Sequence, residues 1–154
     1  MKLSFKTITV AAFLLTLNFE LQVLNSFAQC DTTAIACQKK LSSQYLSDGQ
    51  QYRALLVNSE AAEFTTTFYG GNTYRIVAGS GLNADNVFFR LYDSEHHLLF
   101  NNSEYKNTSF WDFKFTSTVN CTIEAQLANA PADSKSKDVS GCAVLLVGFK
   151  HNSK

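Results

Sequence analysis

The sequence of 154 residues carries 13 Lys and Arg against 13 Asp and Glu, which gives a formal net charge of zero at pH 7. These charges form no basic stripe and no acidic run, so nucleic acids and anionic membrane surfaces, which both bind clustered Lys and Arg, are excluded as favoured partners. Thirteen Phe, six Tyr, one Trp and a single Pro indicate a chain that folds around one hydrophobic core.

The N-terminus has the pattern of an export signal. Lys2 and Lys6 precede an apolar run at residues 8–17, and the triplet Ser-Phe-Ala at 26–28 places small side chains at the two positions that a signal peptidase reads. A permanent membrane span would need about 20 consecutive apolar residues, more than this run supplies. We therefore expect removal of residues 1–28, which leaves no transmembrane span and delivers the chain to the periplasm, the cell surface or the extracellular space.

A short amphipathic helix is predicted directly after the signal. Four side chains recur at helical spacing and would share one face: Ala34, Cys37, Leu41 and Tyr45. Gly49 follows as a residue type that ends helices. The spacing predicts about three helical turns over residues 33–45, within an N-terminal segment that spans 29–50.

Beyond Gly49 the apolar period changes to two, and β-branched and aromatic residues dominate. Strands are predicted at residues 51–57, 63–69, 73–78, 86–92, 98–100, 110–116, 120–127 and 142–149. Short alternating strands are typical of an antiparallel sandwich, because each half-buried sheet needs a second sheet to cover its apolar face. We expect an all-β, jelly-roll-like antiparallel β-sandwich of seven or eight strands at 51–150, preceded by the short helix and followed by a tail at 151–154.

The four cysteines are predicted to form two disulfides in the oxidising compartment that export implies. Four cysteines permit three pairings. The last two strands are expected to be antiparallel neighbours joined by a polar loop at 128–140, which would place Cys121 opposite Cys142. Local pairing then leaves Cys30 with Cys37. The spacings lack the two tight pairs of a zinc site, so no metal site is expected.

No set of catalytic residues converges in the sequence, and we expect a protein that is not an enzyme. His96 and His97 lie in a predicted turn beside Asp93 and Glu95, where solvated side chains are common. The alternative is a small secreted hydrolase that uses His96 or His97 with Asp93 as an acid–base pair.

Aromatic side chains give the best indication of a binding function, because a ring with a polar tip can hold sugars or peptides. Tyr105 and Phe110 are the candidates for exposure, whereas Trp111 shares a strand face with Phe113 and Phe115 and is expected in the core.

Asp93 and Glu95 complete the predicted binding residues. No cofactor is expected, and calcium is the one ion that the scattered loop carboxylates of a sandwich could gather.

Three runs in the middle of the chain follow a known pattern, namely GGNTYRI at 70–76, FRLYD at 89–93 and LLF at 98–100. They resemble the Gly-Thr-Tyr strand and the Leu-Tyr-Asp strand end of the bacterial pre-peptidase C-terminal type of β-sandwich. The whole chain, with DGQ at 48–50 and VGFK at 147–150, is similar to small exported Bacteroidota proteins of unknown function. The resemblance implies an accessory module that has no catalytic residues of its own.

Together these features predict an exported, non-catalytic β-sandwich protein. It would work by surface recognition or as an envelope-associated structural protein, with a protein or a glycan as its unidentified partner. An enzyme inhibitor that presents the loop at 128–140 to its target is a further alternative.

Overall fold

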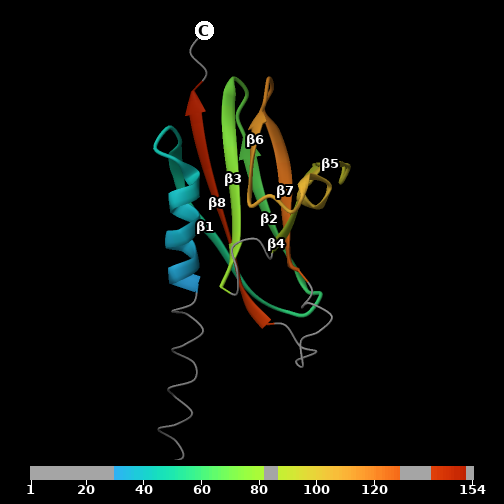
Figure 1. The fold of residues 1–154 in the computed structure, drawn as a ribbon. Helices are drawn as coiled ribbons and strands as arrows, with labels where there is room; N and C mark the ends of the chain where they lie inside the picture. Colours follow the sequence, from blue (N-terminus) through green and yellow to red (C-terminus); the bar gives the residue numbers. More distant parts are fainter. Residues whose placement is uncertain (1–29, 82–86, 129–139, 152–154) are drawn as a thin grey trace, which may run out of the picture.

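Eight strands and a helix make up the computed structural model, which describes residues 30–81, 87–128 and 140–151 (Figure 1). The helix occupies residues 30–41 of the described part. The other elements are, in chain order, β1 (Leu46–Val57), β2 (Ala61–Phe68), β3 (Asn72–Ser80), β4 (Val87–Asp93), β5 (Leu98–Asn101), the 3-10 helix η1 (Asn102–Tyr105), β6 (Phe110–Lys114), β7 (Val119–Leu127) and β8 (Ser140–His151).

All eight predicted strands are present, and β1 and β8 extend beyond their predicted ends. The predicted signal at 1–28, most of the loop at 128–140 and most of the tail at 151–154 lie outside the described residues. Within the described ranges, no helix has both the length and the apolar character that crossing a membrane requires.

The strands form two antiparallel four-stranded sheets. Sheet A has the order β1-β8-β3-β6, and sheet B has the order β2-β7-β4-β5. Two facing sheets with these orders constitute an eight-stranded jelly roll. The predicted fold class is therefore confirmed.

The core between the sheets is built from the alternate side chains of each strand. Phe68 and Phe89 of sheet B and Ile76 and Leu145 of sheet A are fully buried. Removing each such side chain from water contributes about 1.5 to 3 kcal/mol to folding. Trp111 of β6 packs against the same core, which confirms that this strand turns its aromatic face inward.

The helix forms a third layer on the outer face of sheet A (Figure 1). Because β8 has the helix on one face and sheet B on the other, all its side chains from Cys142 to Val147 are buried. Gly79 of β3 allows the close approach of the helix, since a Cβ atom there would lie 2.6 Å from Sγ of Cys37. The second buried cluster, which joins helix and sheet, consists of Cys30, Ala34, Cys37, Leu41, Tyr45, Val77, Cys142, Val144 and Leu146.

The helix ends four residues before its predicted end at Tyr45. It stops at Leu41, because Ser42 adopts a left-handed backbone conformation with φ of 70° and reverses the chain. Tyr45 nevertheless packs in the helix–sheet cluster. The apolar spacing therefore predicted the burial of Tyr45 correctly but overestimated the C-terminal extent of the helix. Gly49 ends no helix, since it lies within β1 with φ of 80°.

The predicted cysteine pairing is wrong. Cys30 is bonded to Cys142, with Cα atoms 5.4 Å apart, and Cys37 and Cys121 are free and buried. Cys121 cannot reach Cys142 because β7 and β8 belong to different sheets, so that Cys121 faces the core and Cys142 faces the helix. Cys30 and Cys37 are seven residues apart on one helix, a rise of about 10 Å that exceeds disulfide reach. Burial raises the pKa of each free thiol to about 11.

Candidate functional site

The sandwich has two lateral edges, and they differ in how they are closed. Strands β5 and β6 lie at the ends of their sheets on one side, and β1 and β2 lie at the ends on the other side. Aromatic side chains close the β5–β6 edge, whereas a pocket opens at the β1–β2 edge. Both edges are candidate sites of recognition.

Tyr105 covers the β5–β6 edge as part of an aromatic cluster. Its ring centroid lies 5.3 Å from that of Phe100 in β5 and 4.4 Å from that of Trp111 in β6. The Phe100 and Trp111 rings are themselves 5.0 Å apart, so the two sheets are bridged by rings at this edge. Tyr105 still keeps 46% of its surface exposed, as the sequence predicted for a binding residue.

Asn102 fixes the backbone of the Tyr105 loop. Its side chain is fully buried and lies against β4: Oδ1 accepts the N–H of Phe89 at 2.9 Å, and Nδ2 donates to the carbonyl of Val87 at 2.9 Å. Nδ2 also donates to the carbonyl of Thr108 at 3.0 Å. This role could not be predicted from the sequence, because a polar residue directly after a short strand is typical of an exposed loop. The loop at 102–109 is therefore anchored at both ends.

Large apolar side chains are exposed around this loop. We define the β5–β6 edge patch as Leu98, Leu99, Tyr105 and Phe110, which are all more than a third exposed. Phe110 faces the outer side of sheet A, where its ring lies 4.5 Å from the Arg75 guanidinium carbon. The structure therefore brings the two predicted aromatic residues, Tyr105 and Phe110, to the same edge, one on each side of the sheet.

Arg75 joins three parts of the outer face. Its guanidinium donates to both carboxylate oxygens of Asp112, at 2.7 and 2.8 Å, and lies between the rings of Tyr45 and Phe110. Hydrogen bonding from Arg75 is the main reason that the pKa of Asp112 lies below its usual range. This ion pair holds the chain after the helix, β3 and β6 in one arrangement.

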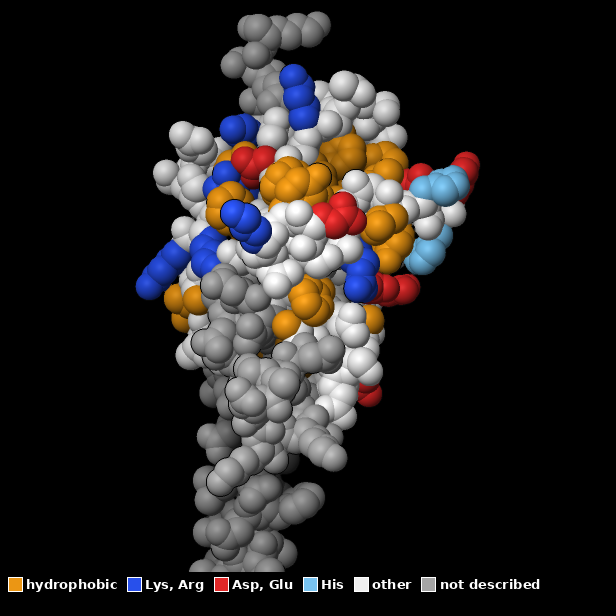
Figure 2. Space-filling view, turned by 45° about the vertical axis from the view of Figure 1, so that its right-hand side comes forward, with side chains coloured by type: hydrophobic (Ala, Val, Ile, Leu, Met, Phe, Trp, Pro, Cys, Tyr) orange, Lys and Arg blue, Asp and Glu red, His pale blue; other side chains and the backbone are white. Residues whose placement is uncertain are grey.

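Asp93 shapes the turn between β4 and β5. Its Oδ1 accepts the N–H groups of Glu95 and His97, at 2.9 and 2.8 Å, and its Oδ2 lies 3.1 Å from Nδ1 of His97. These hydrogen bonds, led by the backbone N–H of His97, lower the pKa of Asp93. His96 stacks on Tyr92 with ring centroids 4.5 Å apart. Figure 2 shows histidine side chains that project from the surface beside acidic ones.

The Asp93–His97 pair has the spacing of an acid–base pair. Within the described residues, no hydroxyl or thiol is hydrogen-bonded to His96 or His97. The same part of the chain contains no group of three or more His, Cys, Asp or Glu side chains that could hold a metal ion. In the structure, Asp93 stabilises the turn between β4 and β5.

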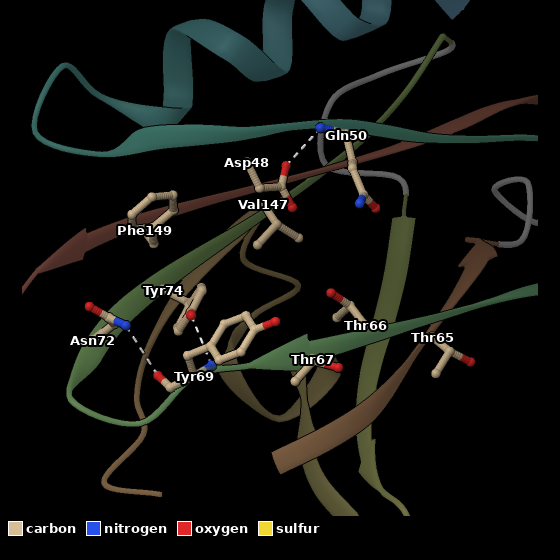
Figure 3. Close-up of a pocket in the computed structure, with 10 residues that line it drawn as sticks. All are labelled: Asp48, Gln50, Thr65, Thr66, Thr67, Tyr69, Asn72, Tyr74, Val147 and Phe149. Atoms are coloured by element: carbon tan, nitrogen blue, oxygen red, sulfur yellow. Dashed lines mark hydrogen bonds between the residues drawn. The ribbon is translucent and has the colours of Figure 1, made fainter. Parts of the chain in front are cut away.

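A pocket of about 540 Å³ lies at the β1–β2 edge (Figure 3). Its walls come from β1, β2, the β2–β3 turn, β3 and β8. The side chains that line it are Asp48, Gln50, Thr65, Thr66, Thr67, Tyr69, Asn72, Tyr74, Val147 and Phe149. The predicted binding residues are absent from this list, so sequence reasoning missed the pocket.

A bulge in β1 opens this pocket. Ser47 pairs with Gly148 of β8 and Gln51 pairs with Leu146, so that three residues at 48–50 face the single residue Val147. Such a bulge bends the strand and re-aims its side chains. The left-handed Gly49 makes the bend, and Asp48 and Gln50 on either side of it reach the pocket (Figure 3).

Among the described residues of the pocket wall, Asp48 carries the one charged side chain. Its Oδ1 accepts the N–H of Gln50 at 2.8 Å, and desolvation by the surrounding walls raises its pKa against the effect of that hydrogen bond. Across the pocket, the hydroxyl of Tyr74 accepts the N–H of Tyr69 at 2.9 Å. The wall therefore combines a carboxyl group, amides and hydroxyls with aromatic surface.

No protein-family model matches this chain, and no curated protein matches it. Among solved structures, it is similar to PliG of Aeromonas hydrophila, a periplasmic inhibitor of g-type lysozyme, with 12% identity, a TM-score of 0.49 and coverage of 68% of this chain and 91% of that one. It is also similar to PliG of Salmonella Typhimurium, with 9% identity, a TM-score of 0.40 and coverage of 66% and 92%. At these identities and TM-scores, the function of this chain has to be inferred from its own residues.

Proposed function

We propose that this chain is an exported, non-catalytic recognition protein that binds a folded protein through the β5–β6 edge patch. The observation that carries the proposal is the fully buried Asn102, which fixes a loop whose Tyr105 remains largely exposed. If Tyr105 served only to cover the core, the exposed apolar side chains beside it would not be needed.

A loop held in one conformation, as Asn102 holds the loop at 102–109, is suited to binding because it is already ordered before the partner binds. Binding then costs less ordering entropy, and more of the contact energy appears as affinity. Tyr105 is also a residue type enriched at binding hot spots, since it offers a large apolar surface and a hydrogen-bonding tip. Leu98 and Leu99 extend the apolar surface next to it.

The charge around the patch defines the partner further. Residues 93–106 contain Asp93, Glu95 and Glu104 against Lys106 alone, which gives a net charge of −2 with neutral histidines. Complementary charge speeds association and favours partners with a basic surface. We infer that the partner is an exported enzyme with a basic rim, and that recognition takes the form of inhibition.

The Cys30–Cys142 disulfide supports the exported location, because disulfides persist in oxidising compartments. Export and removal of residues 1–28 remain part of the proposal. So does the accessory role implied by the resemblance to pre-peptidase C-terminal domains. The loop at 128–140, the first inhibitory segment suggested by the sequence, lies mostly outside the described residues and stays a prediction.

The test is an inhibition assay with the mature chain against a panel of secreted enzymes of high isoelectric point, including g-type lysozyme. We expect slower turnover of at least one enzyme, with inhibition weakened about tenfold by Tyr105→Ala and by Leu99→Asp. Tyr69→Ala is the matched control, since it removes another exposed tyrosine, at the opposite edge. Full inhibition by both β5–β6 variants would contradict the proposed site.

A further inference from the structure

The pocket at the β1–β2 edge is not used by the proposed protein contact, because it lies on the opposite side of the sandwich. Its volume of about 540 Å³ falls within the range of small-molecule sites. Its ligand can therefore be inferred from the chemistry of its wall.

Polar residues occupy positions that the fold would otherwise fill with apolar side chains. Along β2 the inward side chains alternate as Ala62, Phe64, Thr66 and Phe68, so Thr66 places a hydroxyl in an otherwise apolar row. On the opposite wall, the β1 bulge directs Asp48 and Gln50 inward. At the other edge of the sandwich the rings of Phe100, Tyr105 and Trp111 lie together, whereas at this edge one ring pair, Tyr52 and Phe64, joins β1 and β2 among the described residues.

Tyr69 is held in place while its ring stays in solvent. Its N–H donates to the hydroxyl of Tyr74 at 2.9 Å, and its carbonyl accepts Nδ2 of Asn72 at 3.3 Å (Figure 3). The side chain itself is 62% exposed at the pocket wall. An exposed aromatic ring on a backbone held in this way, at the side of a polar pocket, provides a stacking surface for an apolar ligand face.

The lining also excludes classes of ligand. Among the described residues, the lining contains no Lys, Arg or His, so phosphates and carboxylates would meet no opposite charge there. A cation would find the carboxylate of Asp48 alone, and the described residues include no cluster of metal-ligating side chains. Neutral hydroxyl groups, by contrast, fit the carboxyl of Asp48, the amides of Gln50 and Asn72 and the hydroxyl of Thr66.

We propose that this pocket binds a neutral saccharide of one or two sugar units. The ring of Tyr69 stacks on the C–H face of a sugar, and Asp48 and Gln50 accept and donate hydrogen bonds to its hydroxyls. Thr66 contacts the part of the sugar that enters deepest between the sheets. The floor of Val147 and Phe149 covers the remaining apolar edge.

The experiment is a titration of ¹⁵N-labelled mature protein, followed by NMR, with glucose, galactose, mannose, N-acetylglucosamine and its disaccharide. We expect at least one sugar to shift the amide signals of residues 48–50 and 65–72 in a saturable way. Tyr69→Ala and Asp48→Asn should each weaken this binding about tenfold, while both variants keep the wild-type pattern of remaining signals. Tyr105→Ala, the matched tyrosine of the other edge, should bind the sugar unchanged.

Three outcomes would overturn the inference: no sugar of the panel shifts these amides, the shifts fall at the β5–β6 edge, or Tyr69→Ala binds as tightly as wild type. Glucose 6-phosphate tests the exclusion of charged ligands and should bind no more tightly than glucose. Tighter binding of the phosphate would contradict a neutral ligand. Because the two edges carry separate variants, failure here leaves the proposed protein contact untouched.

Discussion

Cys30 of the helix and Cys142 of β8 form a disulfide that closes a chain segment of 112 residues. The bond fixes the outer layer of the molecule to a central strand of sheet A, so it ties together the two ends of the fold. A long closed loop restricts the unfolded chain strongly. This relationship leads to the first of five predictions.

Reduction of the Cys30–Cys142 bond should lower the free energy of unfolding by about 3 to 5 kcal/mol, because loop closure removes entropy from the unfolded state. Urea denaturation of the oxidised protein and of Cys30→Ala measures the difference. The control is Cys121→Ala, which keeps the disulfide and creates only a small cavity. Peptide mapping without reduction should recover Cys30 joined to Cys142, and a peptide that joins Cys121 to Cys142 would refute the assignment.

Asn102→Ala should destabilise the protein by about 2 to 4 kcal/mol, because it leaves the Phe89 N–H and the Val87 carbonyl without their buried partner. The measurement is the urea midpoint, together with hydrogen exchange of the loop at 102–109, which should become faster. The neighbouring Asn101→Ala is the control: its side chain accepts the Ser103 N–H at 3.1 Å at an exposed helix start, so about 1 kcal/mol is expected. Equal losses for the two variants would show that burial of Asn102 has no special role.

Arg75→Lys should cost about 1 kcal/mol, because lysine cannot make the two-pronged contact with Asp112 and cannot stack as a plane between Tyr45 and Phe110. A double-mutant cycle with Asp112→Asn isolates the ion pair, and additive effects would contradict the coupling.

The same pair makes stability depend on pH. The pKa of Asp112 is lower when folded than its usual value of about 3.9, so its contribution is complete above about pH 4 and is lost as the pH falls through the folded value. Melting temperature against pH should therefore fall less steeply in acid for Asp112→Asn than for wild type.

Asp48→Asn should raise the melting temperature slightly at pH 7. Desolvation raises the pKa of Asp48, so its favourable contribution is present below about pH 3.9 and is lost as the pH rises through the folded value. Asparagine keeps the oxygen that accepts the Gln50 N–H and removes the partly desolvated charge. Asp112→Asn should show the opposite sign at pH 7, which makes it the control. A variant that melts lower than wild type at pH 7 would mean that the Asp48 carboxylate stabilises the fold.

Local pattern predicted the strands well because alternation is a property of neighbouring residues. The inward face of Trp111 followed from its alternation with Phe113 and Phe115. Exposure of Tyr105 and the turn built by Asp93 were also anticipated from local sequence. In each case the information lay within one or two elements.

The sites depended on contacts between segments that are distant in sequence. Asn102 stabilises the fold because its side chain hydrogen-bonds to backbone groups of β4. Asp48 lies in the pocket wall because β1 has a bulge where it pairs with β8. No sequence pattern near Asn102 or Asp48 predicts these contacts.

The sequence by itself determined the alternating strands, the approximate place of the helix and the all-β class, because side-chain polarity and backbone preference act between close neighbours. Only the tertiary structure decided which cysteines are bonded, which lateral edge is closed by rings and which opens as a pocket. Those features depend on strand order and register across the two sheets, and these are set by the packing of the whole chain.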